Sequence, residues 1–245
     1  MNDDIKPYWQ SIAEEYDELS LWNKGEREAH LFYLEAMLRL KKDKCSSFLE
    51  LGCGTGFFTA SFYKIFPTIY GVIVDGSSQM LDIAANRIQA LNGDAEYLCR
   101  PLQDIDVSND FKQHFDVVFS ALTIHHLADH NKRKLFGKIY DCLKERGVFI
   151  LYDIFKSFDK RTDELFEQLS SLHMQMRLKN VLSVDFELDE LSLDNIIHND
   201  RTKKAAEGDC EASVEQHLLW LREVGFSHTC IFYMENRFFG AIASK

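Results

Sequence analysis

Three glycines at alternating positions, in the segment Glu50-Leu51-Gly52-Cys53-Gly54-Thr55-Gly56, constrain this chain more than any other feature. They follow an apolar run, Ser47 to Leu51, and precede an aromatic segment with helical character. Glycine permits positive φ and lets a ligand approach the backbone where a Cβ would block it. A helix that begins there offers unpaired N–H groups. The segment predicts a strand, a ligand-binding loop and a helix in succession.

Two acids sharpen this prediction. Glu50 stands at the start of the loop, and Asp75 ends the next apolar run. An acid at the tip of a second strand suits a ribose diol. The spacing nevertheless differs from the dinucleotide fingerprint G-x-G-x-x-G, because Phe57 stands where the third glycine would fall. A P-loop is also excluded, since no Gly-Lys-Ser/Thr ending follows.

Length and composition indicate one substantial α/β domain. The chain has 245 residues, 46% of them hydrophobic, and only 3 prolines and 12 glycines, so little room remains for linkers. The net charge of −11 comes with only short basic runs, such as Lys41 to Lys44 and Lys132 to Lys134. A nucleic-acid partner is therefore not expected, because phosphate contacts need a basic footprint. We expect a small-molecule substrate and leave open a homodimer.

The cysteines and the N-terminus predict a cytoplasmic protein. Six cysteines are scattered without a C-x-x-C pair, which favours reduced thiols and disfavours a zinc site or a disulfide framework. The acidic start, Met1 to Asp4, does not resemble a signal peptide. No apolar stretch has the length of a membrane span, so no membrane association is expected.

Strand-like and helical patterns alternate along the chain. The strand-like runs are Ser47 to Leu51, Thr68 to Asp75, Ala95 to Cys99, Phe115 to Ala121 and Gly147 to Ile154, with helical patterns over about 56–66, 77–91 and 131–143. Continuous apolar strands suit a parallel sheet that is buried on both faces. The alternation predicts a doubly wound sheet with ligands at the carboxyl ends of its strands.

The pattern divides the single domain into four parts. Residues 1–45 are expected to form a helical cover, 46–155 the ligand-binding core, 156–212 a helical insert, and 213–245 a last helix and a β-hairpin. Ser213-Val214-Glu215-Gln216 fits a capping box, and Gly225 follows the end of that helix. The hairpin is predicted from the runs His228 to Met234 and Arg237 to Ala243.

The motif Glu-x-Gly-x-Gly-x-Gly resembles the first motif of the class I S-adenosylmethionine (SAM)-dependent methyltransferases. The resemblance implies a Rossmann-like α/β fold, doubly wound around a mostly parallel seven-stranded sheet, with a C-terminal antiparallel hairpin and the helical insert. It implies methyl transfer from SAM to a small molecule, with S-adenosylhomocysteine as product. By the family's motifs, the cofactor would be bound by Glu50, Gly52, Cys53, Gly54, Gly56, Asp75, Gly76, Met80, Leu102, Gln103, Ala121 and Tyr16.

Each of these assignments has a structural alternative. Asp75 could cap the following helix and Met80 could be a core residue. The aromatic leader around Tyr16 could simply dock its helix. Pro101 stands where the family often has an acid for the adenine amino group, so Leu102, Gln103 or Asp104 would take that role.

The segment from Phe115 to Leu127 resembles the family's fourth motif and carries His125 and His126. Either histidine could act as a base for the acceptor, because its pKa lies near neutrality. The alternative is that the pair caps the strand end and packs between helix and sheet, since methyl transfer needs mainly alignment of the nucleophile. No metal role is expected, because no third ligand stands at a fitting spacing.

Two other functions remain open. The C-terminal block, from Ser213 onward, also resembles the carboxy-SAM synthases of tRNA wobble-uridine modification, which bind SAM in the same fold. By that resemblance Arg201 would bind a ligand carboxylate, although the Gly-Cys-Gly-Thr-Gly loop is typical of ordinary methyltransferases. The second alternative is a non-catalytic SAM-binding protein, because fold alone does not establish an activity.

Overall fold

The computed structural model describes residues 6–19, 24–40, 45–105, 111–182 and 192–245. Its centre is a seven-stranded sheet in the order β3-β2-β1-β4-β5-β7-β6. The strands are β1 (Ser47–Leu51), β2 (Tyr70–Asp75), β3 (Ala95–Cys99), β4 (Phe115–Ala121), β5 (Leu143–Ile154), β6 (His228–Glu235) and β7 (Phe238–Ser244). All neighbours from β3 to β5 pair in parallel, and β7 is antiparallel to both β5 and β6. The predicted fold class is confirmed.

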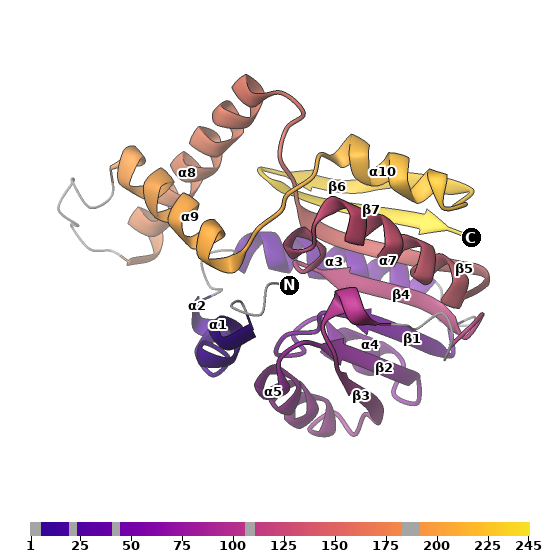
Figure 1. Cartoon of the computed structure of the whole chain (residues 1–245). Helices are drawn as coiled ribbons and strands as arrows, with labels where there is room; N and C mark the ends of the chain where they lie inside the picture. The colour runs from indigo at the N-terminus through magenta and orange to yellow at the C-terminus, as the bar shows by residue number, and fades with distance from the viewer. Residues whose placement is uncertain (1–5, 20–23, 41–44, 106–110, 183–191) are drawn as a thin grey trace.

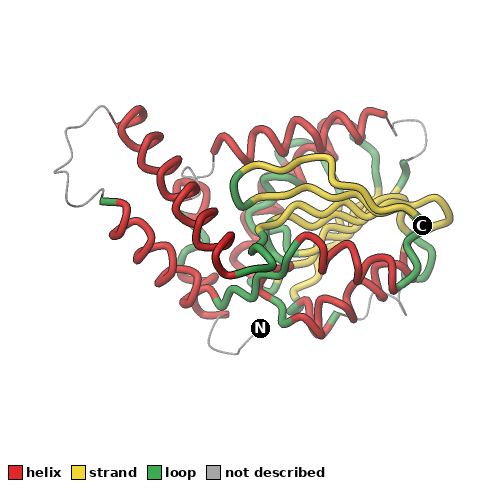
Figure 2. The backbone as a smooth tube through the Cα atoms, turned by 90° about the horizontal axis from the view of Figure 1, so that it is seen from above, coloured by secondary structure: helices red, strands yellow, loops and turns green. Residues whose placement is uncertain are grey.

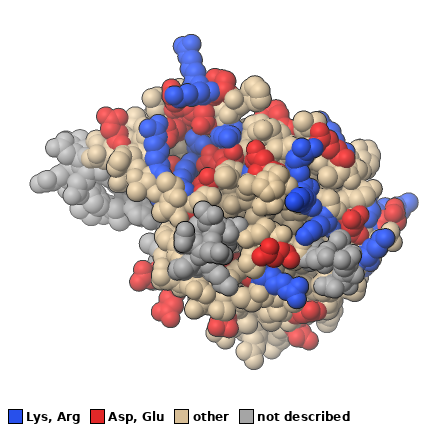
Figure 3. Space-filling view, viewed as in Figure 1, with Lys and Arg blue, Asp and Glu red and all other residues tan. Residues whose placement is uncertain are grey.

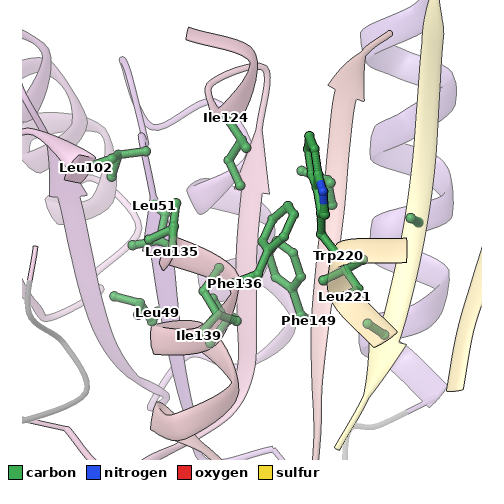
Figure 4. Packing of buried hydrophobic residues seen from close by; sticks show 14 of the residues in the cluster. Leu49, Leu51, Leu102, Ile124, Leu135, Phe136, Ile139, Phe149, Trp220 and Leu221 are labelled. Atoms are coloured by element: carbon green, nitrogen blue, oxygen red, sulfur yellow. The ribbon is translucent and has the colours of Figure 1, made fainter. Parts of the chain in front are cut away.

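Helices cover both faces of this sheet (Figures 1 and 2). On one face, α3 (Lys24–Leu40), α4 (Thr59–Ile65) and α5 (Ser78–Gln89) bury their apolar sides with Phe48, Ile73 and Phe119. On the other face, α7 (Asp129–Cys142) and α10 (Val214–Glu223) pack against β1, β4 and β5. Figure 4 shows this second cluster, in which Phe136, Phe149 and Trp220 lie together. Burial on both faces explains the unbroken apolar runs of the central strands.

The helix ends follow from local chemistry. The Ser77 side chain accepts a hydrogen bond from the Met80 amide and so caps α5. Ser213 and Gln216 form the predicted capping box at the start of α10, and Gly225 follows that helix with φ +116°. β5 begins at Leu143, directly after α7, and not at Gly147 as expected. The strand begins there because Leu143 already pairs with Phe115 of β4. A register irregularity separates this pair from the regular pairs that start at Val117 and Val148.

Shorter elements frame the carboxyl ends of the parallel strands. The leader forms α1 (Lys6–Ser11) and α2 (Tyr16–Leu19), and the 3-10 turns η3 (Leu102–Asp104) and η4 (Ile124–His126) follow β3 and β4. The insert forms α8 (Lys160–Leu182) and α9 (Leu193–Glu207), which lie side by side and project from the body of the domain (Figures 1 and 2). The strand order reverses between β1 and β4, so this edge is where an α/β sheet offers a ligand-binding crevice.

Candidate functional site

A cavity enclosing ≈ 880 Å³ of empty space, counting its open mouth, lies at this crevice. The glycine loop, the end of β2, η3 and the segment after β4 form its walls, and α1 and α2 contribute Trp9 and Tyr16. Of the residues predicted to bind a cofactor, the cavity is lined by Tyr16, Glu50, Gly52, Cys53, Gly54, Asp75, Gly76, Met80, Leu102, Gln103 and Ala121.

Gly56 lies outside the lining, where it packs against Ala84 of α5. The other two glycines of the loop, Gly52 and Gly54, differ in how much space a side chain would find. A Cβ at Gly52 would lie 2.1 Å from Thr123 Cγ2, so only glycine fits between β1 and β4. At Gly54 the space is open, and Tyr16 is the nearest group at 4.0 Å. Since Gly54 has φ +52° and faces the cavity, its backbone is exposed to whatever occupies that space.

Asp75 fixes this loop. One carboxylate oxygen accepts from the Gly54 amide at 2.8 Å, and the other accepts from the Ser77 amide at 2.9 Å. The helix cap itself is Ser77, so the alternative role for Asp75 as cap is not what the structure shows. Burial raises the pKa of Asp75, and the amide donors of Ser77 and Gly54 oppose that effect. Each carboxylate oxygen retains acceptor capacity toward the cavity.

Glu50 is the second acid of the site, and it is more deeply buried than Asp75. It is 1% exposed, and its Oε2 has no hydrogen-bond partner among the described residues. Burial raises the pKa of Glu50 to about 8. A cationic group that enters the cavity would lower this pKa and favour the ionised carboxylate, because an opposite charge stabilises the ionised form.

The leader is tied to the glycine loop through Asp17. The Thr55 hydroxyl donates to Asp17 Oδ1 at 2.7 Å, and Asp17 also forms an ion pair with Arg87 of α5. Burial acts to raise the pKa of Asp17, yet the pKa is lowered, because hydrogen bonds from Arg87 and Thr55 outweigh it. At the other end of the leader, the Tyr8 hydroxyl donates to Glu207 of α9 at 3.1 Å. These contacts hold the leader over the cavity.

The predicted histidine pair lies in η4, and its two members differ. His126 lines the cavity, and its ring lies 5.1 Å from that of Trp9. His125 does not line it: both its backbone amide and its Nδ1 bond to Asp153, which is fully buried at the end of β5. Burial acts to lower the pKa of His125, but Asp153 raises it overall. Burial and the neighbouring His125 lower the pKa of His126.

Asp209, at the end of the insert, joins these histidines. Its Oδ1 lies 3.0 Å from His126 Nδ1 and 3.6 Å from His125 Nε2. The expectation of no metal role rested on the lack of a third ligand at a fitting spacing. That reason fails, because the fold brings Asp209 to the pair from a distant part of the chain, and the three side chains form a group able to hold a metal ion.

Arg201 does not line the cavity. It lies on α9, is 63% exposed, and makes a bidentate pair with Glu167 of α8, with N–O distances of 2.8 and 2.6 Å. The predicted role of Arg201 toward a ligand carboxylate thus has no contact with the cavity to support it.

Several lining residues were not predicted: Trp9, Arg27, Thr55, Phe57, Phe58, Pro101, Leu122, Thr123 and Leu127. Most of them directly adjoin predicted residues, and contiguity with the motifs could have found them. No sequence pattern around Arg27 indicated that it would line the cavity. Its guanidinium lies 4.1 Å from the centre of the Phe57 ring, a contact that only the docking of α3 creates.

Charged side chains on the face shown in Figure 3 are interspersed, without an extended basic area. No helix in the described part of the chain is both long and apolar enough to cross a membrane.

Comparisons with known proteins agree with this architecture. Residues 48–147 match the model of a methyltransferase domain family. The carboxy-S-adenosyl-L-methionine synthase of Psychromonas ingrahamii is 27% identical over 205 residues, which cover 82% of this chain and 76% of that protein. Malonyl-[acyl-carrier protein] O-methyltransferase 1 of Ilyobacter polytropus is 31% identical over 130 residues, or 53% of this chain and 44% of that protein.

Solved structures with the same fold include a complex of DhpI with SAH, with a TM-score of 0.64 and 16% identity over 98% of this chain and 95% of that one. An O-methyltransferase family protein from Burkholderia thailandensis has a TM-score of 0.61 and 16% identity, covering 97% of this chain and 58% of that one. At these identities the structural likeness establishes the fold alone.

Proposed function

This chain belongs to the class I S-adenosylmethionine (SAM)-dependent methyltransferase family, and we propose that it transfers a methyl group from SAM to a small-molecule acceptor. The observation that carries this proposal is the cavity at the β1–β4 switch point, where the glycine loop, Asp75 and Glu50 converge. SAM would supply an electrophilic methyl group bound to a sulfonium, and S-adenosylhomocysteine would remain after transfer.

The residues present fit SAM. The open space beside Gly54 admits a ligand against the backbone, and the buried Glu50 Oε2 lacks a partner among the described residues. Glu50 would attract the ammonium group of the amino-acid moiety, either directly or through water. Asp75 would accept from the ribose hydroxyls while it holds the Gly54 amide. Met80, Leu102 and Gln103 would enclose the adenine, with Pro101 beside them.

The acceptor would enter from the side of Ala121, His126 and the leader. Ala121 ends β4 and lines the cavity, and its small side chain leaves room for the reacting groups. His126 faces the same space and would contact the acceptor, whereas His125 is engaged with Asp153 and would position its neighbour. The leader, tied to Thr55 through Asp17, would exclude water and hold the acceptor in line with the methyl group.

A carboxy-SAM synthase activity is the second candidate, and the relatives similar over 82% of the chain favour it. Two observations weigh toward ordinary methyl transfer. Arg201, which was expected to bind the additional carboxylate, pairs with Glu167 outside the cavity. The loop keeps the Gly-Cys-Gly-Thr-Gly sequence typical of ordinary methyltransferases.

The test combines binding and turnover. Mass spectrometry of nucleotides that copurify with the protein, and calorimetry with SAM, carboxy-SAM and NAD, identify the cofactor. Incubation with SAM and pooled small-molecule acceptors then measures S-adenosylhomocysteine. We expect SAM binding and product formation. Binding without product from any acceptor would favour a non-catalytic SAM-binding protein, and binding of NAD in place of SAM would refute the proposal.

A further inference from the structure

Two histidines and an aspartate meet beside the cavity without satisfying one another. His125 and His126 come from η4, and Asp209 follows α9, after Gly208 ends that helix in the left-handed conformation with φ 73°. The side chain of Asp209 is 5% exposed and those of the two histidines are 7% exposed. His126 Nδ1 and Asp209 Oδ1 lie 3.0 Å apart, but both atoms are buried and neither is aligned for a regular hydrogen bond with a described residue.

Buried polar atoms without hydrogen bonds are costly, so an arrangement of this kind calls for a ligand. We propose that His125 Nε2, His126 Nδ1 and Asp209 form a site for a divalent transition-metal ion, with Zn²⁺ as the best match. The three ligand atoms lie within 4.8 Å of one another. Two ligands of a tetrahedral zinc ion, each about 2.1 Å from it, lie roughly 3.4 Å apart. The separations of 3.0 and 3.6 Å between Asp209 and the histidines bracket that value.

The surroundings support these ligands. Asp153 accepts from the His125 amide at 3.0 Å and contacts its Nδ1, which leaves Nε2 to face Asp209. A carboxylate behind a metal-binding histidine commonly fixes the ring in this way. The loop of Asp209 is itself anchored, because the Cys210 amide donates to the His125 carbonyl at 2.7 Å. The ligands are thus held by the fold.

The donor set determines the class of ion. Two imidazole nitrogens and one carboxylate suit zinc and other first-row transition metals, whereas Mg²⁺ and Ca²⁺ prefer oxygen ligands. The carboxylates of Asp153 and Asp209 also supply negative charge that a dication would balance. His126 lines the cavity, and Asp209 and Cys210 line a second, charged hollow between the insert and the body, which provides a path for the ion. Three protein ligands would leave a coordination position for water or a substrate atom.

The experiment uses the untagged, full-length protein, stripped with a chelator and titrated with Zn²⁺. Calorimetry and metal analysis after dialysis give affinity and stoichiometry, with Mg²⁺ as the comparison ion. We expect one Zn²⁺ per chain and a melting temperature raised by Zn²⁺ but not by Mg²⁺. Asp209→Asn and His126→Gln should each weaken zinc binding at least about tenfold. His198→Gln and Asp194→Asn, exposed positions on α9, should bind zinc as the wild type does.

Wild-type protein without stoichiometric zinc, or an Asp209→Asn variant with undiminished affinity, would overturn the proposal. Circular dichroism shows whether each variant is folded. If the ligand variants unfold, Co²⁺ bound to the wild type decides: intense visible absorption indicates a four-coordinate protein site, and the weak spectrum of the hydrated ion counts against it. Zinc binding is measured without SAM or acceptor, so its outcome is separate from that of the transferase test.

Discussion

The Asp75 carboxylate accepts a hydrogen bond from the Gly54 amide at 2.8 Å, so the tip of β2 holds the loop that follows β1. The same carboxylate accepts from the Ser77 amide at the start of α5. One partly buried acid therefore connects a strand end, the glycine loop and a helix. A ligand that contacts Asp75 would meet an acceptor already oriented by two backbone donors, which lowers the entropic cost of binding.

Replacement of Asp75 by alanine should weaken SAM binding by about 1 to 3 kcal/mol, because ribose hydroxyls would lose their acceptor and the Gly54 amide its anchor. Calorimetry of both proteins with SAM measures this change. Asp82→Ala, at an exposed position of the same helix, is the matched control and should bind normally. Equal affinities in a folded Asp75→Ala protein would show that the ribose lies elsewhere.

Substitution of Gly54 tests the approach of the ligand to the backbone. Gly54 has φ +52°, so any side chain at this position strains the loop. Gly54→Ala should destabilise the fold by about 1 kcal/mol and should weaken SAM binding more than about tenfold. Gly137→Ala is the control, because a Cβ added at this position of α7 would meet nothing within 4 Å beyond its chain neighbours and the backbone of its own helix. That variant should be stabilised by about 0.5 to 1 kcal/mol, with SAM affinity unchanged.

Glu50 should make the stability of the ligand-free protein depend on pH. Its pKa is raised from 4.5 to about 8 by burial, so the folded state retains a proton that the unfolded state releases. The contribution of Glu50 to the free energy of unfolding is fully present below about pH 4.5 and is lost as the pH rises through about 8. Glu50→Gln removes this dependence, and the variant should gain about 3 kcal/mol relative to wild type between about pH 5 and pH 8. Urea unfolding across that range measures the difference; parallel curves for both proteins would contradict the prediction.

The contacts of Asp17 with Thr55, Arg87 and Arg27 should determine how stably the leader covers the cavity. Asp17→Asn keeps the shape of the side chain but weakens the ion pairs with Arg87 and Arg27. We expect faster dissociation of SAM and faster proteolysis within the leader, with little change in the melting temperature of the core. Stopped-flow dissociation and limited digestion measure these effects. Glu15→Gln, an exposed change in the same segment, serves as the control.

A substitution of Arg201 distinguishes methyl transfer from carboxy-SAM synthesis. Because it pairs with Glu167 and lies outside the cavity, Arg201→Leu should change neither SAM affinity nor any preference between SAM and carboxy-SAM. Binding competition between the two ligands measures this, with Glu167→Gln as the partner control. A wild-type preference for carboxy-SAM that disappears in Arg201→Leu would favour the synthase activity and would refute ordinary methyl transfer as the main function.

Much of the fold could be predicted because its signals are local. The apolar run of β4, the glycine loop and the capping box at Ser213 each depend on neighbouring residues. Two strand starts differ from the prediction: β2 begins at Tyr70 and not at Thr68, and β5 at Leu143 and not at Gly147. Pairing with adjacent strands decides where a strand begins. In the site, the predicted cofactor-binding residues other than Gly56 line one cavity, but Trp9 and Arg27 were missed because their roles depend on docked helices.

The sequence by itself determined the strand–loop–helix unit around Gly54 and the acid at the end of the next strand. Short-range backbone geometry and side-chain periodicity specify such units. Only the tertiary structure decided that Asp209 meets His125 and His126, and that Arg201 faces Glu167. Asp209 meets the histidines because the end of the insert packs against the segment after β4, and Arg201 meets Glu167 because α9 packs against α8. No local pattern encodes that packing, because it results from the combined burial and hydrogen bonding of several elements.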